Sequence, residues 1–202
     1  SNYTDLLATE NISHFHENFL PFCEHLPNNV LIETRTKSAN ITALLDYTKK
    51  LNWKSPTQNM EIAFSLSPRI IAKKYELWTA TLDEKLKVIN QLIEKWFRVG
   101  LRFLPLLPIE NFQQIYSKFL DEIISKIDTK KINSITIAPL IFNQWDYNVL
   151  IKKYQNDSDF SFINNLQQNE HQLRTCPNEK ISSIKVLFKE KFKNKNLFRD
   201  YI

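Results

Sequence analysis

Residues 30–41 of the chain read VLIETRTKSANI, and this stretch decides the fold class. It begins like a buried strand, but Glu33, Arg35 and Lys37 then occupy alternate positions. Successive side chains of a strand point to opposite faces, so the three charges share one face. Strands of a parallel α/β sheet are normally apolar on both faces. A charged face here therefore indicates a special environment on one side of the sheet.

Further strand and helix patterns alternate along the chain. Strands are expected at 61–67, at 100–107 and at 134–142. Helices are expected at 10–20, 40–52 and 111–127, and another opens at Thr81, which forms a capping box with Glu84. A loop is expected from Pro68. Helices alternating with strands predict βαβ units and a parallel sheet of the α/β class, here one domain with a C-terminal extension.

The polar face continues onto the neighbouring strands. Glu61 and Ser65 share a face of the second strand, and Arg102 alternates with Leu101 and Phe103 on the third. Buried charge is costly unless it is paired or bound to a ligand. One reading is a cavity for a polar, partly anionic ligand. Structural ion pairs, or an edge strand with one wet face, explain the same pattern equally well.

The cavity reading assigns two groups of residues. Sites in such folds collect at the carboxyl ends of the strands, where Lys37 and Ser65 are expected. The residues expected to line the cavity are Glu33, Arg35, Glu61 and Arg102.

The composition excludes several classes of protein. The chain has one glycine, Gly100, so it holds neither a dinucleotide-binding fingerprint nor a P-loop. It has no eighteen-residue apolar run and no signal-peptide pattern, so neither a membrane partner nor export is expected. With two cysteines in 202 residues, a cytoplasmic location is expected. The net charge of +5 permits an anionic partner.

Several stretches, in their order along the chain, resemble the spore photoproduct lyase family of radical S-adenosylmethionine enzymes. The similar stretches are ETRTKSANI (33–41), IAFSLSP (62–68), KYELWTATLDEKL (74–86) and VGLRFLPLLP (99–108), and SNYTDLLATENI (1–12) also looks like a family segment. The resemblance implies a partial (βα) barrel with about four βα units over residues 1–142. Residues 143–202 would form a mostly helical extension packed on the barrel.

The resemblance also implies a chemistry. Family members bind a [4Fe-4S] cluster and S-adenosylmethionine, and the resulting radical reverses thymine photoproducts in DNA. By this resemblance Lys37 would hold the carboxylate of S-adenosylmethionine, and Ser65 would contact the same cofactor. S-adenosylmethionine and damaged DNA are the partners that it implies.

The chain departs from the family at the cluster. It has no C-x-x-x-C-x-x-C motif, and Cys23 and Cys176 match no family motif, so they are expected to be buried, inert thiols. We therefore expect the C-terminal part of a longer enzyme that is inactive alone, with the missing N-terminal part as a partner. The alternative is a truncated, non-catalytic domain that binds nucleic acid or a partner.

The C-terminal stretch 185–201 is open to two interpretations. Its Lys189, Lys191 and Lys193 alternate with phenylalanines, a pattern that suits contact with DNA. A terminal helix that packs Phe188 and Phe192 on the body and exposes its lysines is favoured. The four histidines form no metal-binding set, and surface positions are expected for His14 and His16.

Overall fold

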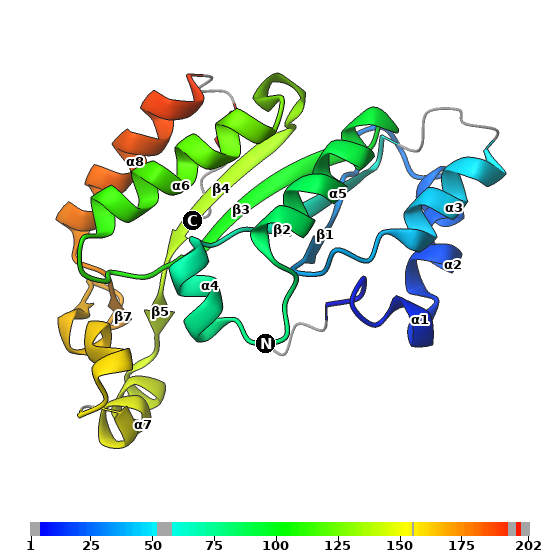
Figure 1. Ribbon diagram of the computed structural model, residues 1–202. Coiled ribbons are helices and arrows are strands. Elements are labelled where there is room, and N and C mark those ends of the chain that lie inside the picture. Colours follow the sequence, from blue (N-terminus) through cyan, green and yellow to red (C-terminus); the bar gives the residue numbers. More distant parts are fainter. Residues whose placement is uncertain (1–4, 52–57, 155, 194–196, 199–202) are drawn as a thin grey trace.

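The fold is built on a parallel sheet of four strands. The computed structural model describes residues 5–51, 58–154, 156–193 and 197–198 (Figure 1). The strand order is β1-β2-β3-β4, and all three pairings are parallel, as the sequence predicts. The strands are β1 (Ile32–Thr36), β2 (Met60–Ser65), β3 (Arg98–Leu106) and β4 (Ser134–Pro139).

Apart from α4, the α-helices at the N-terminus and between the strands lie close to their expected positions. The capping box of Thr81 and Glu84 opens α5, as predicted. These helices are α1 (Glu10–Ser13), α2 (Phe15–Cys23), α3 (Thr42–Lys50), α4 (Arg69–Tyr75), α5 (Leu82–Glu94), α6 (Phe112–Lys126) and the 3-10 helix η1 (Thr129–Lys131).

Two expectations about the chain path are wrong. The loop expected from Pro68 is the short helix α4, because the φ of Pro68, −52°, suits a helix start and Ile71 is buried beneath the helix. The strand expected at 134–142 breaks after Pro139, which has no N–H for the ladder. Ile141–Phe142 form β5, which pairs antiparallel with β7 in a second sheet.

Residues after 143 contribute both helices and short strands. The second sheet has the order β5-β7-β6 and joins the end of the barrel to the extension. The elements of the extension are α7 (Gln144–Tyr154), η2 (Ser158–Asn165), β6 (Gln167–Gln168), β7 (Arg174–Thr175) and α8 (Asn178–Phe192).

The main core lies between the apolar face of the sheet and its helices. Figure 1 shows α5 and α6 crossing the sheet, with α8 beside α6. Phe103 of β3 contacts Phe119 of α6 and Phe188 of α8, with ring centroids 5.9 and 4.7 Å away. The helices therefore cover the apolar side and leave the charged residues on the other face.

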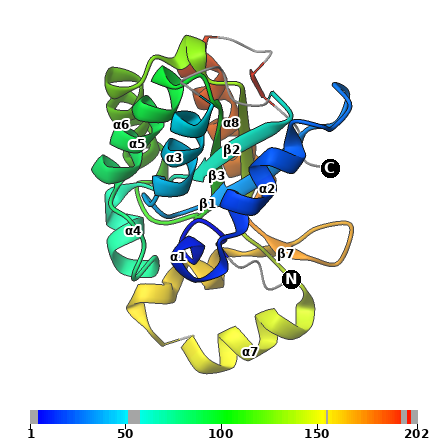
Figure 2. The ribbon, with the colours of Figure 1, turned by 90° about the vertical axis from the view of Figure 1, so that its right-hand side faces the viewer.

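The carboxyl ends of the strands gather several connecting elements. In Figures 1 and 2, α1, α4 and α7 lie toward the lower edge of the molecule, which is the end to which the four strands run. None of the described helices is long and apolar enough to cross a membrane.

Candidate binding site at the carboxyl ends of the strands

Arg102 forms the centre of a buried ion-pair network on the polar face of the sheet. Its Nη2 donates to Glu61 Oε1 at 2.6 Å and to Glu33 Oε2, and its Nε donates to Glu33 Oε1 at 3.1 Å. Its Nη1 donates to Ser134 Oγ at 2.9 Å and to the carbonyl of Leu101 at 3.1 Å. Arg102 and Glu61 are fully buried. Every nitrogen of the guanidinium has a partner, so the network is self-contained.

The remaining expected lining residue lies at the outer side of this network. Arg35 donates to Glu33 Oε1 at 2.5 Å, and its side chain is 40% exposed. Burial opposes the ionisation of Glu33, but hydrogen bonds from Arg102 and Arg35 outweigh it and lower the pKa of Glu33 to about 2. The four residues line neither of the two pockets described below, so their role toward a ligand stays a prediction.

The single glycine of the chain makes room for the network. Gly100 lies on β3 between Ala63 and Ser134 in the strand register. A Cβ at this position would lie 2.7 Å from Glu61 Oε1 and 2.8 Å from Arg102 Nη1. The guanidinium and the carboxylate therefore occupy space that any other residue would fill.

A second cluster of polar groups lies at the carboxyl ends of β1 and β2; we call it the rim cluster. Lys37 Nζ lies 2.7 Å from Glu76 Oε1, which also accepts a hydrogen bond of 2.6 Å from Ser67 Oγ. Lys85 Nζ donates to the carbonyl of Ser65 at 3.2 Å and lies 3.9 Å from Glu76 Oε2. The rim cluster thus comprises Lys37, Ser65, Ser67, Glu76 and Lys85. It includes both residues for which the family resemblance implies cofactor binding.

The rim cluster is shielded from water to different degrees. The side chain of Lys37 is 34% exposed, and that of Glu76 is 8% exposed. Lys85 is almost fully buried; desolvation lowers its pKa, and the nearby carboxylate of Glu76 opposes that change. Asp5 holds the backbone at the end of β1, since its carboxylate accepts a hydrogen bond from the backbone N–H of Lys37 at 2.7 Å.

Glu76 and Lys85 are not among the site residues expected from the sequence. A signal for Lys85 is present, because it falls on the apolar stripe of α5 with Leu82, Leu86 and Ile89. A charge on a buried helix face needs a partner in the core. Glu76 follows α4, in a stretch where a loop was expected, and no local sequence pattern indicates that its carboxylate reaches Lys37.

A small pocket opens beside the rim cluster; we call it the rim pocket. Its volume is about 200 Å³. Lys37 and Glu76 are the charged residues of its lining, and most of the other lining side chains are apolar or aromatic, among them Tyr75, Phe160 and Phe162. Glu76 Oε2 is buried and accepts no hydrogen bond from the residues that the structure describes. The rim pocket thus offers a cation, an acceptor without a hydrogen bond and an apolar wall, which suits a small zwitterion.

The cysteines do not fit an iron–sulfur cluster. Cys23 and Cys176 are buried, as predicted, and neither is in a disulfide bond; burial raises the pKa of Cys176 to about 11. Within the described ranges no group of three or more His, Cys, Asp or Glu side chains could hold a metal ion. A [4Fe-4S] cluster needs more thiolates than this chain has.

His16 corrects one expectation. His14 lies at the surface, but His16 is fully buried, with its Nδ1 2.8 Å from Glu10 Oε2. The carboxylate of Glu10 also accepts from the backbone N–H groups of His16 and Glu17 and so caps the first turn of α2. The surface position expected for His16 is wrong, because its buried ring is paired with Glu10, a residue of the preceding helix α1.

The C-terminal lysines lie on a packed helix. Phe188 and Phe192 of α8 are buried, which confirms the packing interpretation. Lys191 forms an ion pair with Asp121 of α6. Contact of Lys189, Lys191 and Lys193 with DNA stays a prediction.

The fold is that of a partial parallel (βα) barrel, and it carries a cluster of charged side chains at the carboxyl ends of its strands. Among solved structures, the chain is similar to a spore photoproduct lyase double mutant with bound AdoMet and dinucleoside spore photoproduct. The TM-score is 0.78 at 13% identity, covering 100% of this chain and 59% of that one.

Other structures of the same lyase give similar values. The lyase complexed with dinucleoside spore photoproduct has a TM-score of 0.76 at 13% identity, over 100% of this chain and 59% of that one. A tyrosine-to-phenylalanine mutant gives 0.73 at 14% identity, over 96% and 57%. The chain thus has the fold of this lyase and spans about three fifths of its length. No protein-family model and no curated protein sequence matches the chain.

Proposed function

We propose that the chain is the C-terminal part of a radical S-adenosylmethionine enzyme of the spore photoproduct lyase kind, which repairs thymine photoproducts in DNA. The observation that carries the proposal is the position of Lys37, at a strand end and on the wall of the rim pocket. Support also comes from the likeness to a lyase structure with bound AdoMet and dinucleoside spore photoproduct.

The rim cluster fits the amino-acid end of S-adenosylmethionine. The ammonium of Lys37 would hold the carboxylate of the ligand, a charge-assisted hydrogen bond. Glu76 Oε2, buried and without a hydrogen bond from a described residue, would accept from the α-ammonium of the ligand. Ser65 would contact the same cofactor beside Lys85, which holds the Ser65 carbonyl.

The lysine of the site is already neutralised by a carboxylate in this chain. Because Glu76 Oε1 lies 2.7 Å from Lys37 Nζ, a bound carboxylate would share or displace that ion pair. Glu76 therefore holds the side chain of Lys37 in place before the ligand arrives.

No radical step is assigned to the residues of this chain. S-adenosylmethionine supplies a 5′-deoxyadenosyl radical when a [4Fe-4S] cluster reduces it, but the two cysteines here do not fit such a cluster. The cluster would come from thiolates outside these 202 residues, which in the proposal belong to a further part of the same enzyme.

Calorimetric titration of S-adenosylmethionine into the chain tests the proposal. Binding is expected, and Lys37→Met should weaken it about tenfold or more, since a hydrogen bond to a charged group contributes about 1.5–3 kcal/mol. Lys49→Met is the matched control, because Lys49 is an exposed lysine of α3. 5′-Methylthioadenosine, which lacks the amino-acid group, should bind both variants equally.

Equal affinity of the Lys37 and Lys49 variants for S-adenosylmethionine would refute the assignment. Absence of any binding would favour the second candidate, a non-catalytic domain that binds nucleic acid or a partner. The closed ion pair between Lys37 and Glu76 is the observation that favours that candidate.

A further inference from the structure

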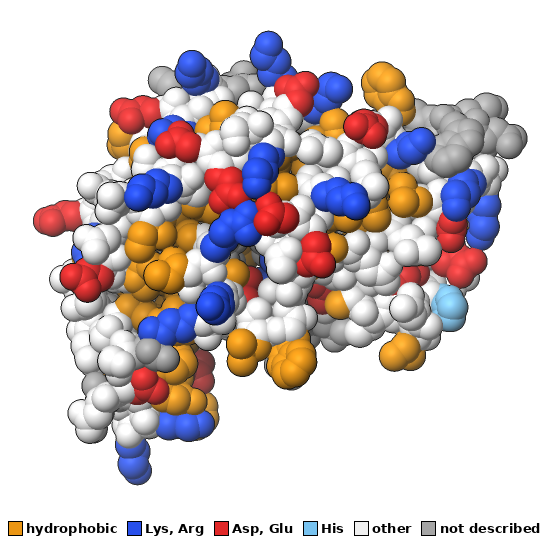
Figure 3. All heavy atoms as spheres, in the orientation of Figure 1, with side chains coloured by type: hydrophobic (Ala, Val, Ile, Leu, Met, Phe, Trp, Pro, Cys, Tyr) orange, Lys and Arg blue, Asp and Glu red, His pale blue; other side chains and the backbone are white. Residues whose placement is uncertain are grey.

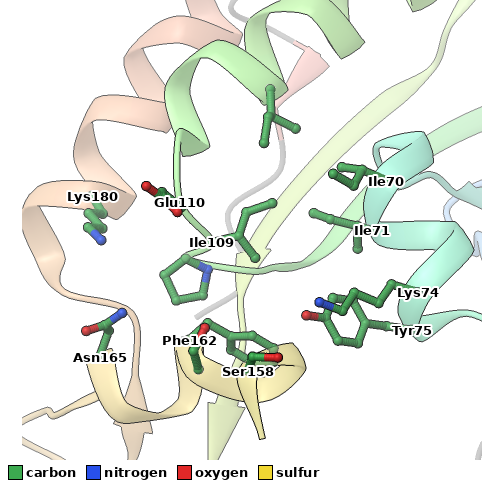
Figure 4. A pocket seen from close by; sticks show the side chains of 13 residues that line it. Ile70, Ile71, Lys74, Tyr75, Ile109, Glu110, Ser158, Phe162, Asn165 and Lys180 are labelled. Carbon is green, nitrogen blue, oxygen red and sulfur yellow. The ribbon is translucent and has the colours of Figure 1, made fainter.

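A larger cavity lies next to the rim pocket, and none of the roles proposed above uses it; we call it the α4–α8 pocket. It has a volume of about 590 Å³, which lies within the usual range of small-molecule sites. Its walls come from α4, the loop after β3, the first turn of α6, η2 and the first turn of α8 (Figure 4). On the face shown in Figure 3, hydrophobic side chains gather in a hollow between α4 and α8.

The pocket has polar ends and an apolar middle. Figure 4 shows Lys180 and Asn165 on one side, Lys74 and Tyr75 on the other, and Ile109 with Phe162 between them. An elongated ligand with an apolar central part would match this order of groups. Ile70, at the edge of the pocket, is 60% exposed, an apolar surface that a ligand would cover.

Several polar side chains of the pocket are exposed to solvent. Ser158, Ser161, Asn165 and Lys180 line it, and none of their side chains makes a hydrogen bond or an ion pair with another described residue. Lys180 and Lys74 lie on opposite sides of the pocket, and Glu110 is the acidic residue of its lining. On the side of Lys180, its ammonium and the amide of Asn165 suit an oxyanion such as a phosphate.

The α4–α8 pocket adjoins the rim pocket. Ile71, Tyr75 and Phe162 line both cavities. The rings of Tyr75 and Phe162 meet edge to face with centroids 5.5 Å apart, so one layer of side chains separates the two spaces. A DNA strand whose lesion approaches the cofactor held at the rim cluster would therefore place a neighbouring nucleotide near the α4–α8 pocket.

We infer that the α4–α8 pocket binds one nucleotide of a DNA strand next to the lesion. The phosphate lies at Lys180 and Asn165, and the base lies against Ile109 and Phe162. The inference rests on the proposed DNA substrate, which supplies the chemical class of the ligand. The pocket itself supplies the phosphate-binding groups, the apolar surface and the place beside the rim cluster.

Titration of the isotope-labelled chain with deoxythymidine 5′-monophosphate, followed by NMR, tests the inference. Chemical-shift changes are expected at Asn165, Ile109 and Phe162. Lys180→Gln should weaken binding about threefold to tenfold, a range that allows for the solvent exposure of Lys180. Glu110→Gln should strengthen binding about twofold, because it removes a like charge facing the phosphate.

Two controls make the result specific. Lys87→Gln removes an exposed lysine of α5 that lines neither pocket, and it should leave the affinity unchanged. Thymidine, which has no phosphate, should bind more weakly than the nucleotide and should not respond to Lys180→Gln. Equal effects of the Lys180 and Lys87 variants, or no opposite effect of Glu110→Gln, would overturn the inference.

Failure of this inference can be told from failure of the proposed function. Lys37→Met should not alter nucleotide binding, and Lys180→Gln should not alter S-adenosylmethionine binding. If Lys37→Met leaves the affinity for S-adenosylmethionine unchanged while Lys180→Gln weakens nucleotide binding, the nucleotide site is supported and its link to the lyase chemistry is refuted. If Lys37→Met weakens S-adenosylmethionine binding while Lys180→Gln leaves nucleotide binding unchanged, the cofactor site is supported and the α4–α8 pocket has no role in substrate binding.

Discussion

Replacing Gly100 with alanine should destabilise the protein, although the same change at an unconstrained strand position does the opposite. Glycine in a strand interior costs about 0.5–1 kcal/mol relative to alanine, so Gly→Ala is ordinarily favourable. Here the new Cβ would lie 2.7 Å from Glu61 Oε1 and 2.8 and 2.9 Å from the two Nη atoms of Arg102. Both groups are fully buried and have no free space into which to move.

The magnitude follows from what the network would lose. Forcing an extra methyl group into a packed core costs about 1–3 kcal/mol. Full separation of a buried ion pair costs about 3–5 kcal/mol. Because Arg102 also holds Glu33 and Ser134, it would keep part of its bonding after a small shift. We therefore expect a loss of about 2–4 kcal/mol, which lowers Tm by roughly 4–16 °C for a chain of this size.

Urea unfolding followed by circular dichroism measures this loss. The matched experiment places Gly100→Ala in a background of Arg102→Met with Glu61→Ala, where a flexible thioether replaces the rigid guanidinium and the carboxylate nearest to the new Cβ is removed. The cost of the added methyl group should then fall below about 1 kcal/mol, giving a coupling energy typical of residues in contact. A Gly100→Ala variant as stable as the unchanged chain would refute the account of why glycine stands here.

Three further predictions concern single interactions. Thr81→Ala removes the capping box of α5 and should cost about 1 kcal/mol in urea unfolding, whereas Thr79→Ala, in the preceding loop, should cost less. Phe188→Ala should cost about 3–5 kcal/mol, because the ring is fully buried against Phe103; a cost below 1 kcal/mol would contradict this packing. Glu33, with a folded pKa of about 2 against an ordinary value of 4.5, stabilises the fold above pH 4.5, and this contribution is lost as pH falls toward 2; acid titration of Glu33→Gln should lack that part of the loss.

The sequence predicted the frame of the fold well because the signals were local. The period-2 and period-3.6 patterns placed four strands and the helices between them, and the T-x-x-E spacing placed the start of α5. The stretch from Pro68 was misread because a seven-residue helix is too short to show a period. The break after Pro139 was missed because the apolar run of the sequence continues across it to Phe142.

Only part of the candidate site could be predicted from the sequence. Lys37 and Ser65 could be placed at strand ends by counting alternate residues, because strand geometry is regular. Their partners come from distant positions: Glu76 follows α4, and Lys85 reaches Ser65 from α5. The α4–α8 pocket joins segments separated by about a hundred residues, and no local pattern predicts such a meeting.

Alternation and periodicity are properties of neighbouring residues, so they were enough to predict a parallel α/β sheet with one charged face. How the charges on that face are paired depends on the tertiary structure. Three strands bring Glu33, Glu61 and Arg102 into one closed network around the space that Gly100 leaves free. Lys37 stays at the rim with Glu76 as its partner. A buried charge pairs with the group that lies nearest in space, and the strand register and helix packing set that distance, not the separation along the chain.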